Sequence, residues 1–123
     1  MLNIEFECAA ASDVIKTGCL SLDAGNRKEA ETLITKALGV LQENGIYAFY
    51  LYMKSKEKKV YEIIESESKK ILKTIIFNDL DTTKEGCQIA SEITDDLDKM
   101  LLAKDILERV LVYSRYHAKT IRG

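Results

Sequence analysis

The sequence predicts an all-α protein, a single compact helical bundle of five to six helices in one domain that spans residues 1–123. The chain contains no proline, so the strongest helix breaker is missing. In most segments apolar residues recur at spacings of three and four, which is the period of an amphipathic helix. Hydrophobic residues make up 46% and charged residues 31% of the chain, a composition typical of a globular domain that buries a core without disulfides or metals.

The most apolar stretch is residues 41–56, LQENGIYAFYLYMKSK, and the other helices are expected to pack around it. Its large side chains from Ile46 to Met53 cover the whole circumference of a helix, which predicts burial on every side. The stretch is shorter than the roughly 20 apolar residues that cross a bilayer, so we expect it to be buried against this protein or copies of it, and not in a membrane. Gly45 is expected to mark a kink or a close backbone approach, with a third helix over about residues 45–54.

Two helices are expected before this stretch. The first covers about residues 3–22, and helical spacing assigns its apolar face to Phe6, Ala10, Val14, Cys19 and Leu22. Gly25 is the expected stop after its C-terminus. Asn26 is then expected to cap the second helix, with Glu29 completing a capping-box pattern.

A fourth helix is expected within residues 55–77, where isoleucines, leucine and valine alternate with lysine and glutamate at helical spacing. Glu65 and Lys69 are placed to form an i,i+4 ion pair on it. Residues 78–83 are expected to form a loop, after which a short helix carries Ile89 and Ile93.

The last helix is expected to begin near Thr94 or Asp95, because acidic residues are favoured in a first helical turn. It should continue to about Lys119. Projection predicts an apolar side made of Ala103, Ile106, Leu107, Val110, Leu111, Ser114, Ala118 and Ile121.

The sequence offers no candidate catalytic residue, cofactor-binding residue or metal ligand. The single histidine, His117, lies at the edge of the predicted apolar side, where a packed ring is commoner than a general base. The acids Asp95, Asp96 and Asp98 lack the ligand spacing of a calcium loop and are expected at a helix start. The glycines form no nucleotide-binding motif. The three cysteines form no CxxC pair, which fits small core residues in a reducing cytoplasm.

Charge is distributed unevenly along the chain. Residues 79–98 carry seven acids against the single cation Lys84, whereas residues 54–59 carry four lysines against Glu57. Residues 109–123 contain Arg109, Arg115, Lys119 and Arg122 and no acid. These cations, with Tyr116 beside them, are suited to phosphate contact and base stacking. They are equally expected as the solvated end of a helix, with Asp105 pairing with Arg109 and Lys104 with Glu108.

Two stretches resemble the small helical subunit of the type III-B CRISPR (Cmr) RNA-targeting complex. ENGIYAFYLYMKSK is similar to that family's pattern of asparagine-glycine, apolar and aromatic residues and terminal lysines. AKDILERVLVYSRYHAKT is similar to its last helix, in which small, large apolar and arginine residues alternate. The chain lacks the proline and the tryptophan often found in the family, so a related small subunit, of a type III-A or type I-A complex, stays open.

The resemblance implies a non-catalytic subunit without cofactors, whose copies stack along an effector complex and help to line the path of the target RNA. Its partners would be the other subunits of a CRISPR effector complex, guide or target RNA, and copies of itself. By position, the resemblance implies phosphate contacts for Lys54, Lys56, Arg109 and Arg115, and Lys119 extends the basic end of the last helix. The acidic stretch 79–98 would meet a basic surface of the next copy.

Two other classes of protein remain open on the sequence. A helical ribonuclease of the HEPN type would need an arginine followed, after four to six residues, by a histidine. The spacings from Arg109 and Arg115 to His117 do not fit that pattern. The remaining class is an oligomerising adaptor that makes no contact with nucleic acid.

Overall fold

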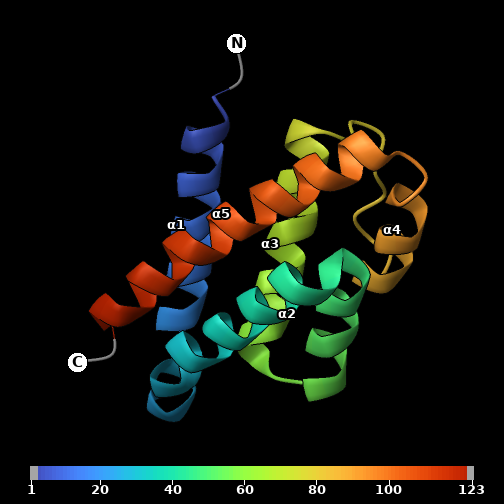
Figure 1. Cartoon of the computed structure of the whole chain (residues 1–123). Coiled ribbons are helices and arrows are strands. Elements are labelled where there is room, and N and C mark those ends of the chain that lie inside the picture. The colour runs from blue at the N-terminus through green and yellow to red at the C-terminus, as the bar shows by residue number, and fades with distance from the viewer. Residues whose placement is uncertain (1–2, 122–123) are drawn as a thin grey trace.

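The computed structural model describes residues 3–121 and confirms the all-α prediction. It contains five helices over this range, and no strand occurs in it: α1 (Ile4–Leu20), α2 (Ala24–Lys56), α3 (Lys59–Ile75), α4 (Gly86–Ile93) and α5 (Leu97–Ile121). In Figure 1, α5 runs from the α4 side across α1 to the opposite side of the molecule. One continuous core takes buried side chains from all five helices.

The predicted apolar face of α1 is wrong for three of its five residues, whereas Cys19 is buried and Leu22 is partly buried. Phe6 and Val14 are 66% and 50% exposed, and Ala10 between them is exposed as well. The buried side consists of the smaller residues Cys8, Ala11, Ser12, Ile15 and Cys19. Small side chains let the α1 backbone approach α5 closely, and the Ser12 hydroxyl donates a 2.7 Å hydrogen bond to the carbonyl of Ala9, so it is satisfied when buried.

The predicted cap of α2 is also wrong. Asp23 is the N-cap, and its Oδ1 accepts a 2.9 Å hydrogen bond from the backbone N–H of Asn26. A carboxylate at this position satisfies one free N–H and interacts favourably with the helix dipole. Gly25, expected as a stop after the first helix, lies inside the first turn of α2. The chain therefore turns from α1 into α2 within residues 21–23.

Gly45 marks the kink that was predicted for α2. Its backbone angles, φ 91° and ψ −175°, are not helical and divide the helix into residues 24–44 and 46–56. Burial of the second part on every side was predicted, and this is wrong. Its inner side chains Ile46, Phe49, Tyr50 and Met53 are buried, whereas Tyr47 and Leu51 are each 49% exposed.

The predicted apolar sides of α3 and α5 are confirmed. On α3 the buried residues include Val60, Ile64, Ile71 and Leu72, and Glu65 pairs with Lys69 at 3.3 Å. On α5 all of the predicted residues from Ala103 to Ala118 are buried. Asp96 precedes α5 and accepts a hydrogen bond from the N–H of Lys99, so the acids do occupy the helix start. The side chain of Ile121 and all of Arg122 lie outside the described residues.

The short helix α4 packs closely against the second part of α2. Gly86 faces the ring of Tyr50, and a Cβ at position 86 would overlap that ring. The Tyr50 hydroxyl is fully buried and lies 2.7 Å from the Ser68 hydroxyl on α3. The ring of Tyr50 contacts α4 and its hydroxyl contacts α3, so this residue of α2 links the three helices. Within residues 3–121, no helix has the length and apolarity required to span a membrane.

Candidate nucleic-acid interface

The C-terminal half of α5 presents two cations and an aromatic ring on its outer side. Arg109 and Tyr116 are seven residues apart and therefore lie on the same side of the helix. Tyr116 is 62% exposed. The Nζ of Lys119 lies 5.5 Å from the centre of the Tyr116 ring, and Arg109 forms an exposed 3.4 Å ion pair with Asp105. We refer to Arg109, Tyr116 and Lys119 as the α5 outer face.

Arg115 lies one turn before Lys119 on α5, so the two side chains are neighbours on the helix surface. Arg115 is only partly exposed, whereas Arg109, Tyr116 and Lys119 are exposed. Its Nε atom is buried and has no hydrogen-bond partner among the described residues. Lys104, which had been expected to pair with Glu108, instead donates a 3.2 Å hydrogen bond to the carbonyl of Gln42 on α2.

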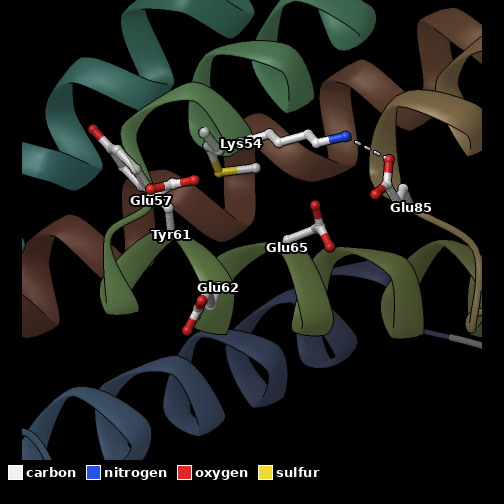
Figure 2. A pocket seen from close by; sticks show the side chains of 7 residues that line it. Lys54, Glu57, Tyr61, Glu62, Glu65 and Glu85 are labelled. Atoms are coloured by element: carbon white, nitrogen blue, oxygen red, sulfur yellow. Dashed lines mark hydrogen bonds and ion pairs between the residues drawn. The ribbon is translucent and has the colours of Figure 1, made fainter.

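Lys54 and Lys56 lie at the end of α2, in a different electrostatic environment. Figure 2 shows Lys54 extended to Glu85, at an Nζ to Oε2 distance of 2.8 Å, with Glu65 pointing toward the pair from α3. The hydrogen bond and the charge of Lys54 lower the pKa of Glu85, and Glu85 raises the pKa of Lys54. The surrounding cleft has a volume of about 280 Å³ and is called the α2–α3 cleft. It is lined by Met53, Lys54, Glu57, Tyr61, Glu62, Glu65 and Glu85.

Lys56 is exposed at the same end of α2, with its Nζ 5.4 Å from the centre of the Tyr52 ring. The end of α2 (green) and the end of α5 (red) lie on opposite sides of the molecule in Figure 1. The structure therefore divides the five predicted nucleic-acid-binding residues. Arg109 and Lys119 share one outer face, Arg115 lies beside it, and Lys54 and Lys56 lie on the far side.

A groove between α1 and α5 runs beside the α5 outer face and was not expected from the sequence. It has a volume of about 310 Å³ and is lined by Glu5, Ala9, Ser12, Tyr113, Tyr116 and His117. His117 Nε2 lies 3.4 Å from the carboxylate of Asp13 on α1. The sequence indicates this groove only indirectly, through small residues on one helix and aromatic residues on another.

Burial raises the pKa of the thiols of Cys8, Cys19 and Cys87, so none of the three is activated as a nucleophile. Among residues 3–121, no group of three or more histidine, cysteine, aspartate or glutamate side chains is arranged to hold a metal ion. Exposed cations beside an exposed tyrosine can instead contact phosphates and stack on bases.

No family model matches this chain, and neither a characterised protein nor a solved structure shows significant similarity to it.

Proposed function

We propose that this chain is a non-catalytic small subunit of a CRISPR ribonucleoprotein effector complex, and that it contacts the phosphates of guide or target RNA. The proposal rests on the α5 outer face, where Arg109 and Lys119 flank an exposed Tyr116. Cations of this kind bind the RNA backbone without reading its sequence, and the tyrosine offers a surface for stacking. The net charge of −2 means that such binding depends on a local surface.

Assembly with copies of itself and with other subunits is supported by exposed apolar side chains in two places. Phe6 and Val14 are exposed on α1, and Leu97 and Leu101 are exposed at the start of α5. Exposed apolar surface of this kind favours protein contacts. The acidic start of α5 and its basic end have opposite charges, which favours contact between neighbouring copies. A cytoplasmic location is part of the same proposal.

The phosphate contacts can be tested by RNA binding over a salt series. Fluorescence anisotropy with single-stranded RNA should give an affinity that falls steeply as salt rises, because bound cations release counterions from the RNA. The double variant Arg109→Glu/Lys119→Glu should lower the affinity by about tenfold or more at low salt. Lys54→Glu/Lys56→Glu is the matched control, because it changes the net charge equally on the opposite side of the molecule, and we expect a much smaller effect.

Three results would contradict the proposal. An equal loss of affinity in both double variants would show that net charge, and not the α5 outer face, governs binding. An absence of salt-dependent binding would favour the oligomerising adaptor. Metal-independent cleavage of the RNA that disappears in His117→Ala would favour the ribonuclease. Arg115 and His117 are two residues apart on a helix and project to different sides, which is unsuited to joint catalysis.

A further inference from the structure

We propose that the groove between α1 and α5 holds one unpaired nucleobase of the bound RNA, stacked against Tyr116 and Tyr113. This inference rests on the proposed function, because it requires phosphates on the neighbouring α5 outer face. At about 310 Å³ the groove is at the small end of the range for ligand pockets, roughly 300 to 1,000 Å³, which suits a single flat ring.

The lining of the groove provides the aromatic surface that an unstacked base requires. Tyr113 lies on one turn of α5, and Tyr116 and His117 lie on the next turn, so the three side chains form one wall. The opposite wall is the α1 backbone with the small side chains Ala9 and Ser12, so flat rings can approach closely. The Ser12 hydroxyl already donates to the carbonyl of Ala9. The groove therefore offers stacking surface, which accepts any base because every base has a π face.

The charges around the groove favour different positions for the phosphate and the base of a nucleotide. Lys119 lies over the Tyr116 ring, and Arg109 is one turn below Tyr113, close enough to Cys8 on α1 for its charge to act on that thiol. Phosphates are attracted to these cations. Glu5 lines the groove itself and would repel a phosphate, but its carboxylate can accept a hydrogen bond from an amino group on a base. The backbone therefore follows α5 and the base turns toward α1.

The test compares a short adenine RNA with an abasic ribose-phosphate chain of the same length and charge. Stacking of one base contributes about 1–3 kcal/mol, so the RNA should bind the full-length protein about tenfold more tightly than the abasic chain. Tyr116→Ala should bring the RNA affinity close to that of the abasic chain and should weaken abasic binding much less. Tyr116→Phe keeps the ring and should retain the preference.

A second variant fills the groove and leaves its aromatic residues unchanged. Ala9→Leu places a larger side chain against the tyrosines and should abolish the preference for RNA over the abasic chain. Ala10→Leu is the matched control, because it is the same change one residue along α1, at an exposed position outside this groove. Circular dichroism of both variants checks that each is folded.

The outcomes separate this inference from the proposed function. Equal, salt-dependent binding of the RNA and the abasic chain would overturn the base site and leave the phosphate contacts standing. An undiminished preference in Ala9→Leu, or equal losses in Ala9→Leu and Ala10→Leu, would also overturn it. If neither probe binds, both proposals fail.

Discussion

The α2–α3 cleft and the α5 outer face contain the same kinds of residue and differ in what surrounds them. A lysine lies over a tyrosine ring near each of them, with Lys56 over Tyr52 beside the cleft and Lys119 over Tyr116 on the outer face. In the cleft, however, Lys54 is held by Glu85, and further glutamates lie around it. On the α5 outer face, Arg109 pairs with Asp105 through an exposed contact.

The comparison shows that the number of cations in a stretch of sequence does not determine whether they can bind a phosphate. The run KSKEKK is the most basic in the chain, but Lys54 and Lys58 form ion pairs with Glu85 and Glu29. An incoming phosphate would have to compete with those carboxylates for the lysines, and the other glutamates that line the cleft would repel it. Local pairing with residues distant in sequence therefore decides which basic surface is available.

The largest effect that we predict is the loss of stability in Gly86→Ala. The added Cβ would overlap the buried Tyr50 ring and push α4 away from α2. Overpacking of a core costs about 1–3 kcal/mol, and we expect the upper end because the overlap is with a fully buried ring. Urea unfolding followed by circular dichroism would measure the change. This variant disturbs the cleft and should leave the α5 outer face intact.

Gly39→Ala is the matched control for that variant. Position 39 lies within the first part of α2, and an added Cβ would meet no atom within 4 Å. Alanine is favoured over glycine in a helix, so the free energy of unfolding should rise by about 0.5–1 kcal/mol. Equal stabilities for the two variants would contradict the close packing of α4 on α2.

A smaller effect is expected when the cleft is made to resemble the α5 outer face. Glu85→Gln removes the carboxylate that holds Lys54, so this lysine becomes available to a phosphate. RNA affinity at low salt should rise by about two- to fivefold. The same change in a Lys54→Gln background frees no cation and should give a smaller gain. Equal gains in both backgrounds would mean that only net charge had changed.

The smallest effect concerns the titration of Glu85 itself. Its pKa is lowered from the ordinary value of 4.5 by the hydrogen bond and charge of Lys54. Because the pKa is lower in the folded state, the stabilising contribution of the pair is present above the ordinary pKa and is lost as pH falls through the folded pKa. Carboxyl NMR should detect the lowered pKa, and Lys54→Met should return it toward 4.5. An unchanged pKa in that variant would show that Lys54 is not held.

Most of the fold could be predicted from the sequence, because α3 and α5 bury large aliphatic residues at a clear helical period. The prediction failed on α1, where the buried side is made of small residues such as Cys8 and Ala11 and the larger Phe6 and Val14 face outward. A helical projection assigns the larger apolar residues to the buried side, whereas close contact between two helices requires small residues. The bend at Gly45 was expected from the glycine, but Asp23 as the cap was not.

The candidate site was less predictable, because it depends on which helices meet. Arg109 and Lys119 could be placed together, since one helix carries both. The pairing of Lys54 with Glu85 joins residues 31 positions apart, with all of α3 between them in the chain, and no local pattern indicates it. The groove likewise requires α1 to lie beside α5, which brings Ala9 and Ser12 to Tyr113 and Tyr116. Contacts of this kind are set by the packing of the whole core.

The backbone angles at Gly45 determine whether an L-residue or a D-residue fits position 45. The angles φ 91° and ψ −175° are the mirror image of an extended conformation that L-residues adopt freely, so a D-residue takes them without strain. An L-alanine there would touch no atom within 4 Å and would still be strained, because the cost arises in its own backbone. A chemically synthesised chain with D-alanine at position 45 should therefore keep the two parts of α2 at their present angle.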